Sequence, residues 1–480
     1  MKEIKGLKNI RESFRTRQFR YGGYAALITL AVIVGLILLN LIVGQFSPYI
    51  DMTESGLFSL TEQTLQVVDA VKSPVNFYGL WRPGEEYPEL PQIIDLYLAR
   101  NRNIRLELVD PNRNPGLLAR FDRANQGIPN GSLIVEGEKG FKVITPNDFY
   151  DFMDNYQNNT RSVTGLAMER RITAALLFVA TGQTPVIYEV TGHQETLLAD
   201  LGLQTMVERE NFSVRQINLM QSPIPDDASI LLLNAPYSDL TQLEAERILN
   251  YLDKGGRLMI LADLFTGDVT MINEVLASYG FRLDYGYLVE NDIYHTGGAP
   301  YLVFPDMADH DITNPLVQQR TPVLIYNGMG MSELEAKRRT VELKPLLSSS
   351  AISFLRIDLL EDTVDQIASD IRGPITIGMT ATDPSWVQGD EPQTRIVAVA
   401  SGALLATYQY APGNMDFFLN SITWLQDRPE TLSVRSKSMF LLPMMINAFL
   451  INLYGVIIVI VIPVGFFIAG FVIWLRRRHL

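Results

Sequence analysis

The order of apolar and polar positions divides the chain into two long apolar stretches, one towards each end, and a mixed region between them. The first stretch, Tyr24–Val43, has 20 residues and no charge, and about 20 helical residues cross the hydrocarbon core of a bilayer. The second stretch lies between Lys437 and Arg476 and is too long for one straight span. We expect an interfacial lead-in there, followed by a span at Leu453–Leu475. The pattern therefore predicts one membrane-spanning helix at each end.

Two other interpretations of these stretches fit the sequence less well. A cleaved signal peptide would have a shorter apolar region and a small-residue cleavage site, and the sequence around Tyr24–Val43 has neither. A buried core helix rarely runs as far without a charge as the segment that follows Lys437 does. We therefore predict an uncleaved anchor at the start and a second anchor at the end.

The first part of the mixed region alternates between strand and helix patterns. Ser59 and Glu62 have the spacing of a capping box, which predicts the start of a helix. Alternating or continuous apolar runs predict strands, and 3.6-residue periodicity predicts helices. The strands are expected at 75–81, 104–110, 132–138 and 140–146. The further helices are expected at 90–101, as a short helix between 110 and 132, and at 163–181. The order β-α-β-α-β-β-α predicts a small α/β sandwich.

A second α/β pattern follows. Thr241 and Glu244 form another capping-box pair, and Gly255–Gly256 provides the glycine signal that ends the helix. Strands that alternate with helices predict a parallel, doubly wound sheet. The strands are expected at 185–192, 213–219, 229–235, 257–263, 375–381 and 395–401, and the helices at Glu195–Asn211, after Thr241, and at Asn414–Leu425. Between about 283 and 375 the pattern is irregular and predicts short strands.

The charges are distributed unevenly. The whole chain carries −13, but the first 23 residues carry +5 and Arg476–Arg478 carry +3, which leaves −21 for the rest. Basic residues beside membrane spans remain in the cytoplasm, so both termini are expected there and the large middle region outside it. An acidic middle region argues against nucleic-acid binding, which requires a basic surface.

The composition and motifs argue against several kinds of chemistry. The chain has no cysteine, which excludes a thiol nucleophile and cysteine metal ligands. It also has no phosphate-binding loop of the G-x-x-x-x-G-K-[ST] type. Ser401 follows a predicted strand but not in a G-x-S-x-G elbow. Asp306, Asp309 and Asp311 around His310 fit either a cation site or a solvated acidic loop, and the loop is favoured because the histidines lack ligand spacing.

The best candidate site is the turn Thr191-Gly192-His193-Gln194-Glu195. It follows a predicted strand and is expected to open a helix, which places it at the carboxyl edge of the sheet, where open α/β folds bind ligands. Backbone N–H groups there could hold an anion. The alternative is structural: His193 packs within the turn and Glu195 balances the helix dipole. We predict that His193, Gln194 and Glu195 form a contact surface without catalytic, cofactor-binding or metal-binding residues.

Segments spread over nearly the whole chain occur in a characteristic order and spacing. They are 51–64 (DMTESGLFSLTEQT), 163–176 (VTGLAMERRITAAL), 186–195, 231–263, 310–316, 395–405, 417–430 and the terminal span that ends in Arg476–Arg478. Together they resemble the GldG-like auxiliary components of bacterial ABC transporters, the gliding-motility type. Two places depart from the family pattern. The usual G-H-G-E is Gly192-His193-Gln194-Glu195 here, and an acidic G-D-S-D-F-like turn is replaced by residues 400–404 (ASGAL).

The resemblance implies a fold and a set of partners. It implies a thioredoxin-like domain followed by a flavodoxin-type, amidotransferase-like domain, and these work with a permease and a cytoplasmic ATPase. Trp81-Arg82-Pro83-Gly84 stands where a redox thioredoxin has C-x-x-C, so dithiol chemistry is excluded. The expected domains are a basic cytoplasmic segment (1–23), a transmembrane helix (24–46), the thioredoxin-like domain (47–182), the amidotransferase-like domain (183–435), and a lead-in, transmembrane helix and basic tail (436–480).

The leading functional hypothesis is a non-enzymatic auxiliary subunit of an ABC transporter in the bacterial inner membrane. Its large extracytoplasmic region would dock on or gate the permease, or engage the substrate, whose identity the sequence does not give. The alternatives are a membrane-tethered receptor that captures a solute or glycan directly, and a purely structural tether to the envelope. Membrane lipid is an expected partner in each case.

Overall fold

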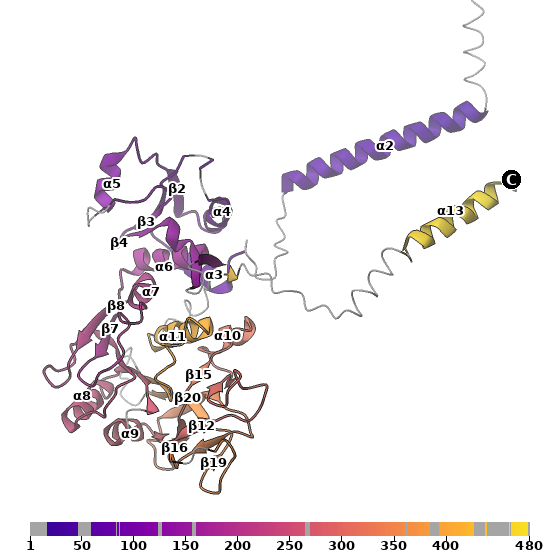
Figure 1. Ribbon diagram of the computed structural model, residues 1–480. Helices are drawn as coiled ribbons and strands as arrows, with labels where there is room; N and C mark the ends of the chain where they lie inside the picture. The colour runs from indigo at the N-terminus through magenta and orange to yellow at the C-terminus, as the bar shows by residue number, and fades with distance from the viewer. Residues whose placement is uncertain are drawn as a thin grey trace, which may run out of the picture. The chain divides into compact units, whose positions relative to one another are not determined.

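The computed structural model consists of two compact units, Met1–Phe58 and Ser59–Leu480 (Figure 1). Helices and strands are both abundant and form several sheets, which confirms the predicted α/β class. The structure describes residues 17–46, 59–82, 84–85, 87–122, 127–155, 160–264, 269–360, 363–384, 393–426, 437–438, 460 and 462–478.

Helices occupy both predicted apolar stretches. In the first unit, α2 (Arg17–Phe46) has 30 residues, and its side chains from Leu27 to Leu39 are exposed. Near the other end of the chain, α13 (Ile462–Arg478) covers the later part of the predicted span, and most of the earlier part lies outside the described residues. Counting only the described residues, no helix is long and apolar enough to cross a membrane. The two spans are therefore not supported by the structure itself and remain a proposal.

The second unit begins with a four-stranded sheet. Its order is β2-β1-β3-β4, with β1 parallel to β2 and antiparallel to β3, and with β3 and β4 forming the predicted hairpin. The strands are β1 (Val75–Gly79), β2 (Ile104–Leu108), β3 (Leu133–Gly137) and β4 (Gly140–Ile144). The helices of this part are α3 (Glu62–Ala70), α4 (Leu90–Arg100), α5 (Pro115–Phe121) and α6 (Met168–Thr181). The predicted order β-α-β-α-β-β-α is confirmed, with further strands inserted before α6.

Two local predictions in this part were wrong. The N-cap of α3 is Thr61, whose side chain accepts a hydrogen bond from the backbone N–H of Thr64, and not Ser59. The helix predicted at 163–181 begins only at Met168, because residues 160–166 form strand β6 (Thr160–Leu166). This strand pairs with β5 (Tyr150–Asn155), and periodicity along the chain does not reveal such a partner.

The main sheet of the second unit has ten strands and is mixed. Its order is β11-β16-β20-β21-β10-β9-β7-β8, with β17 beside β20 and β14 beside β17. The five strands from β21 to β8 run parallel, as predicted, whereas β20, β16 and β11 are antiparallel, so the sheet is not doubly wound throughout. The parallel strands are β7 (Val186–Val190), β8 (Ser213–Ile217), β9 (Ala228–Asn234), β10 (Arg257–Leu261) and β21 (Thr394–Val399).

The antiparallel part of this sheet accounts for much of the region where the sequence pattern was irregular. Its strands are β11 (Phe281–Asp284), β14 (Asp306–Met307), β16 (Gly330–Glu333), β17 (Glu342–Ser348) and β20 (Thr376–Asp383). Two small sheets lie in the same region, formed by β12 (Tyr287–Val289) with β18 (Phe354–Arg356) and β19 (Ile371–Arg372), and by β13 (Leu302–Val303) with β15 (Ile325–Tyr326). The prediction of short strands between 283 and 375 is confirmed.

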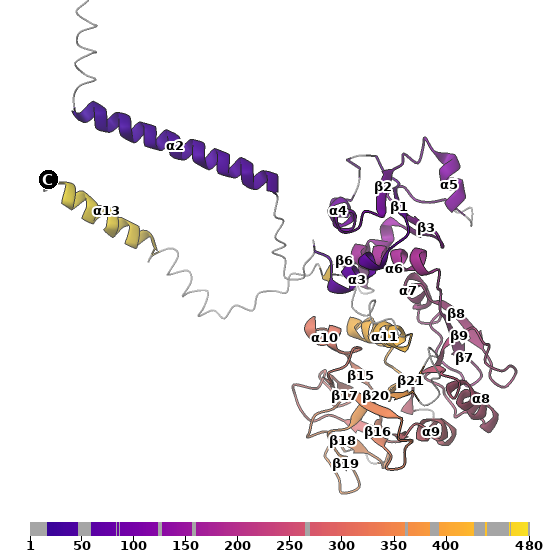
Figure 2. The same cartoon turned by 180° about the vertical axis from the view of Figure 1, so that it is seen from behind.

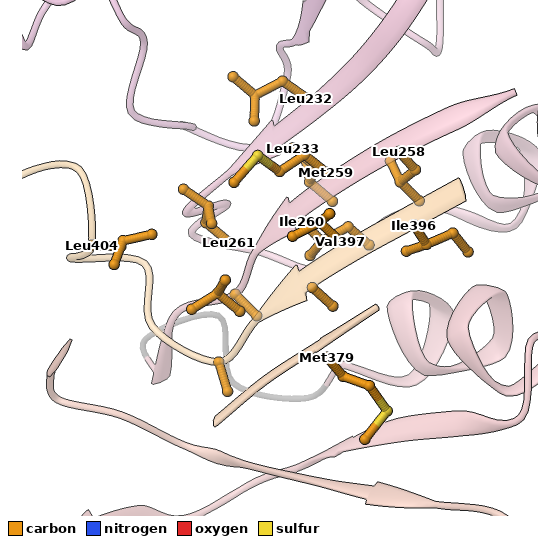
Figure 3. Close-up of a cluster of buried hydrophobic side chains, with 14 of the residues drawn as sticks. Leu232, Leu233, Leu258, Met259, Ile260, Leu261, Met379, Ile396, Val397 and Leu404 are labelled. Atoms are coloured by element: carbon orange, nitrogen blue, oxygen red, sulfur yellow. The ribbon is translucent and has the colours of Figure 1, made fainter. Parts of the chain in front are cut away.

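The central parallel strands are buried on both faces. Consecutive side chains of a strand point to opposite faces, yet Leu232 and Leu233 of β9 and Met259 and Ile260 of β10 are all almost fully buried (Figure 3). This explains the continuous apolar runs in the sequence, which are typical of parallel strands covered on both sides. The helices of this part are α7 (Gln204–Arg209), α8 (Gln242–Leu252), α9 (Thr270–Ala277), α10 (Asn314–Gln318) and α11 (Pro412–Leu425).

Helix α6 joins the first sheet to the second α/β part through a buried ion cluster. Its adjacent Arg170 and Arg171 are 10% and 6% exposed, and both reach one carboxylate oxygen of Glu210, which follows α7, at 3.3 and 2.6 Å. Arg170 also pairs with Asp151 of β5 at 3.0 Å. Strand β5, helix α6 and the end of α7 therefore meet at the start of α6, because the buried arginines need carboxylate partners.

Two segments of the second unit that are far apart in sequence, one near Thr61 and one at Lys437–Ser438, attach beside the start of α6. The carboxylate of Glu169 accepts hydrogen bonds from the backbone N–H (2.6 Å) and hydroxyl (2.9 Å) of Thr61, three residues after the first unit ends. Strand β22 (Lys437–Ser438), which precedes the second apolar stretch, pairs with Leu166 and Gly165 of β6. Figure 2 shows α3, β6 and α6 together from behind. Both points of attachment therefore lie within a few residues of Met168.

Candidate functional site

The three residues predicted as a contact site lie in the loop that follows β7. Because β7, β9, β10 and β21 run parallel, their carboxyl ends share one edge of the sheet. The loop with His193, Gln194 and Glu195 therefore lies at the edge where ligands of open α/β sheets usually bind. This is the position that the sequence predicts for it.

The loop does not open a helix, so this part of the prediction was wrong. Residues 195–203 are turns and irregular backbone, and only Gln204–Arg209 of the predicted helix Glu195–Asn211 is helical. The sequence argument that a helix dipole stabilises Glu195 therefore does not apply. The same holds for an anion site at a helix start.

Other groups bind the backbone N–H groups that the predicted helix would have used. The N–H of Thr196 donates to the carbonyl of Asn234, at 3.0 Å, and the N–H of Leu198 donates to the carboxylate of Glu189, at 2.7 Å. Glu189 lies within β7 and is 2% exposed. Its burial raises its pKa, which the hydrogen bond from Leu198 opposes. These tertiary partners outweigh the local helix propensity of the segment.

His193 lies between two buried carboxylates. Its Nδ1 is 3.1 Å from Oε1 of Glu195, and its Nε2 is 3.1 Å from Oε2 of Glu244. The side chains of His193, Glu195 and Glu244 are 8%, 3% and 0% exposed. A second carboxylate oxygen of Glu195 accepts the backbone N–H of His193 at 2.8 Å. We call these three residues the carboxylate–histidine cluster.

Glu244 belongs to this cluster and also caps α8. Its Oε2 accepts hydrogen bonds from the backbone N–H (2.9 Å) and hydroxyl (2.8 Å) of Thr241, which confirms the predicted capping box. The cluster therefore ties the loop after β7 to the first turn of α8. No pattern in the sequence predicts this contact, because no motif relates His193 to a residue so far along the chain.

The cluster favours the protonated imidazole. The hydrogen bond to Glu195 raises the pKa of His193, burial opposes this, and the charge of Glu244 raises it further. Burial works to raise the pKa of Glu195, but hydrogen bonds from His193 outweigh it, and the pKa lies below its ordinary value. Both ring nitrogens face carboxylate oxygens, so only the imidazolium can donate to both. The geometry therefore favours an imidazolium at His193, between the two carboxyl groups.

We expect the stability contributed by His193 to depend on pH. Because the pKa of His193 is raised in the folded state, its contribution is complete below about 6.5, the value for the unfolded chain, and is lost as the pH rises through the folded-state pKa. The difference in unfolding free energy between wild type and His193→Gln should therefore be larger at acidic than at alkaline pH. Denaturant titrations across this range measure it. A difference that grows with pH would contradict the imidazolium.

Gln194 has a different environment from its neighbours. Its side chain is exposed, and its backbone has φ 60°, in the left-handed region. Gly192, two residues earlier, has φ 132°. The G-H-G-E pattern, which has glycine where Gln194 stands, suits this backbone because glycine adopts positive φ without strain.

Gln194→Gly should therefore stabilise the protein by up to about 1 kcal/mol. The left-handed backbone destabilises a residue with a Cβ by roughly 1–2 kcal/mol, and glycine removes this penalty. Part of the gain is lost because glycine gives up more conformational entropy when the chain folds. Gln194→Ala keeps the Cβ and serves as the matched control, with no gain expected. Thermal unfolding of the wild type and the two variants measures this difference. A destabilised glycine variant would mean that the Gln194 side chain makes stabilising contacts.

The exposed surface around the cluster is small and mixed. The backbone N–H of Tyr237 donates to the carbonyl of His193 at 2.8 Å, and the Tyr237 side chain is 61% exposed. Met220, whose sulfur lies 3.1 Å from the Thr241 hydroxyl oxygen, is 49% exposed. Gln194, Tyr237 and Met220 can therefore reach a partner at this edge, whereas His193 and Glu195 position the loop. The sequence predicted one contact role for His193, Gln194 and Glu195, and the structure separates the exposed Gln194 from the two buried residues.

The candidate cation ligands around His310 make packing contacts and hydrogen bonds within the protein. His310 is 8% exposed, its ring packs edge-on against Trp424, and burial lowers its pKa. Asp309 accepts a hydrogen bond from the Asn314 side chain. Across the described residues, no group of three or more carboxylate and histidine side chains is placed to hold a metal ion.

The remaining two candidates, Ser401 and the turn at Trp81, have packing roles. The Ser401 hydroxyl donates to the carbonyl of Tyr326 at 2.8 Å. Trp81 is 5% exposed and lies so close over Gly79 that a Cβ there would be 2.6 Å from its ring. Arg82 pairs with Asp110 at 3.1 Å. Pro83 lies outside the described residues.

Comparison with known proteins gives little similarity. No family model and no curated protein matches the chain. Among solved structures, the mmIFT52 N-terminal domain is 14% identical, with 50% of this chain and 96% of that one covered and a TM-score of 0.36. The exo-beta-1,4-mannosidase Op5Man5 from Opitutaceae bacterium strain TAV5 is 8% identical, with 70% and 47% covered and a TM-score of 0.26. Both similarities are too low to carry an argument.

Proposed function

We propose that this chain is a non-enzymatic auxiliary subunit of a bacterial ABC transporter, of the GldG-like type that its sequence resembles. Both ends would cross the inner membrane, and the residues between them would lie outside the cytoplasm. A separate permease would form the translocation path, and a separate cytoplasmic ATPase would supply the energy, because the sequence has no phosphate-binding loop.

One observation carries this proposal: Thr61 and Lys437, which lie on the inner sides of the two apolar stretches, attach beside the first turn of α6. Thr61 is bound to Glu169, and Lys437 pairs with Leu166. Two apolar segments that leave a folded region from neighbouring positions can enter one membrane side by side. This arrangement suits a region tethered at two points better than a connector between distant sites.

The exposure of α2 supports a membrane environment. Leu27, Leu36 and Leu41 are 63%, 60% and 66% exposed, and the side chains between Leu27 and Leu39 are exposed throughout. Apolar surface of this extent is unfavourable in water. The proposed span itself rests on the sequence of α2, which contains the uncharged 20-residue stretch Tyr24–Val43.

The sheet order supports a thioredoxin-like first domain. The order β2-β1-β3-β4, with the first pair parallel and the last two strands antiparallel, is the arrangement that this proposal requires. The five parallel strands of the main sheet likewise support a flavodoxin-type core in the second domain. A chain without cysteine has no dithiol chemistry, so we propose that the first domain acts in binding or assembly.

Purification of the tagged full chain from native membranes tests the proposal. The expected result is co-purification with a polytopic membrane protein and an ATPase in defined ratio. Protease added to spheroplasts should also digest residues 50–435 and spare both ends. An intact complex without an ATPase, or protection of the middle region, would contradict the proposal.

We expect the second apolar segment to contact the permease. Gly465 and Gly470 lie in α13, and a Cβ added at either meets no described atom within 4 Å. Small residues let transmembrane helices approach closely, so Gly465→Leu with Gly470→Leu should reduce permease co-purification several-fold and leave the second unit folded. Alanine at both positions is the control. Undiminished co-purification of the leucine variant would assign the contact to other parts of the chain.

A further inference from the structure

The segment after β18 is closed at its base by a buried ion pair. Arg356 binds both carboxylate oxygens of Asp370, with Nε–Oδ1 at 2.8 Å and Nη2–Oδ2 at 3.0 Å, and the side chains are 3% and 0% exposed. The same guanidinium donates to the carbonyls of Thr363 (2.6 Å) and Asp365 (2.7 Å). We call residues 357–360 and 363–370 the docking loop. The ion pair of Arg356 and Asp370 anchors this loop at its base.

The docking loop reverses the usual distribution of polarity. The charged side chains of Arg356 and Asp370 are buried at its base. By contrast, its large apolar side chains are exposed: Ile357 by 47%, Leu359 by 44%, Leu360 by 95% and Val364 by 58%. The turn that presents Leu360 is fixed, because its backbone N–H donates to the Asp358 carboxylate at 3.1 Å. Several large apolar side chains gathered on an anchored loop mark an interaction site more often than scattered single ones do.

A small cavity adjoins the docking loop. Its volume is about 260 Å³, and Ile357, Ile371, Tyr285, Leu283 and Asn273 line it together with Arg282 and Asp284. This volume is below the range of roughly 300–1,000 Å³ of small-molecule sites. It suits a single side chain of a partner. Ile357 belongs to both features, so the loop and the cavity form one surface.

The charge of this surface selects the partner. Asp358 and Asp365 lie in the docking loop, and both are exposed. The buried pair of Arg356 and Asp370 contributes no net charge, so the loop is acidic. An acidic apolar loop is repelled by anionic lipid and attracted by Lys and Arg. A second copy of this chain in a symmetric contact would set the acidic loops against each other, which is unfavourable.

We propose that the docking loop and its cavity form a protein-binding surface, whose partner offers apolar side chains flanked by Lys or Arg. This goes beyond the proposed transporter role and does not depend on it. The apolar side chains of Leu359, Leu360 and Val364 supply the buried centre of the contact, and the acidic residues supply its rim.

Photo-crosslinking in native membranes tests this. A photoreactive amino acid replaces Leu360 in the full chain, and a second version carries it at Tyr410, which is 85% exposed and lies outside the loop. After irradiation, the crosslinked peptide is sequenced by mass spectrometry. The expected product is a peptide of another protein with apolar residues flanked by Lys or Arg, at least tenfold more abundant than any product from position 410.

A charge variant completes the test. Asp358→Asn keeps the oxygen that accepts the Leu360 N–H, so with Asp365→Asn it should leave the fold intact and lower the crosslink yield at least threefold. Crosslinks to lipid, to a second copy of this chain, or to a peptide without Lys or Arg would overturn the proposal. So would a yield at position 360 no greater than at position 410, or an undiminished yield from the charge variant.

Discussion

Glu210→Ala should lower the free energy of unfolding by about 3–5 kcal/mol, the cost of removing one partner from a buried ion pair. Glu210 is the carboxylate that both Arg170 and Arg171 reach. Arg170 keeps Asp151 as a partner, at 3.0 Å, whereas Arg171 is left as a buried cation 6% exposed. Burial and the nearby Arg170 lower the pKa of Arg171, and the charge of Glu210 opposes this more than that of Asp151 does. Loss of Glu210 therefore removes the main partner of the Arg171 cation.

Chemical denaturation of the solubilised full chain, followed by tryptophan fluorescence, measures this effect. Glu210→Gln keeps the shape and one hydrogen-bond acceptor and should fall between wild type and the alanine variant. Asp69→Ala is the control, because it removes a carboxylate from an exposed pair with Arg100, and both side chains are 48% exposed. Equal effects of Glu210→Ala and Asp69→Ala would mean that the α6 cluster is solvated in solution.

His193→Ala should cost roughly 2–4 kcal/mol, between the cost of an unsatisfied buried polar group and that of a broken buried ion pair. The substitution leaves Glu195 and Glu244 buried near each other without their shared cation. Glu244 already has one oxygen, Oε1, without a hydrogen-bond partner among the described residues. If His193 lay in a turn without charged partners, its replacement by alanine would lower the free energy of unfolding only modestly. The two carboxylates are the reason for the larger expected loss.

A double-mutant cycle separates this cluster from general packing. In the His193→Ala background, Glu244→Gln should cost less than it does in wild type, because the glutamine removes a charge that has lost its partner. The same cycle with Gln194→Ala should show no coupling, since Gln194 is exposed. Additive effects of His193→Ala and Glu244→Gln would show that the two side chains do not interact.

Local signals in the sequence predicted the elements well where the chain itself provides the partners. The Thr241–Glu244 capping box and the β3–β4 hairpin are contacts between residues close in sequence, and both are confirmed. The long apolar runs of β9 and β10 predicted central strands, because only buried strands tolerate them on both faces. Helix α11 lies where the periodicity placed it.

Distant partners explain what the sequence did not predict. Residues 195–203 are not helical because Glu189 and Asn234 take their backbone N–H groups. The start of the predicted helix at 163 is a strand because β5 pairs with it. The candidate turn was located correctly, but its division into buried His193 and exposed Gln194 depends on Glu244, which no local pattern connects to the turn.

The attachment of both chain ends at α6 has a consequence for how such a protein can diverge. The region between Thr61 and Lys437 begins and ends at neighbouring positions, and such a region can change in size without moving its points of attachment. The two ends are held where Thr61 binds Glu169 and where Lys437 pairs with Leu166. Lineages can therefore enlarge, trim or exchange the second α/β part, docking loop included, while the two ends keep their separation.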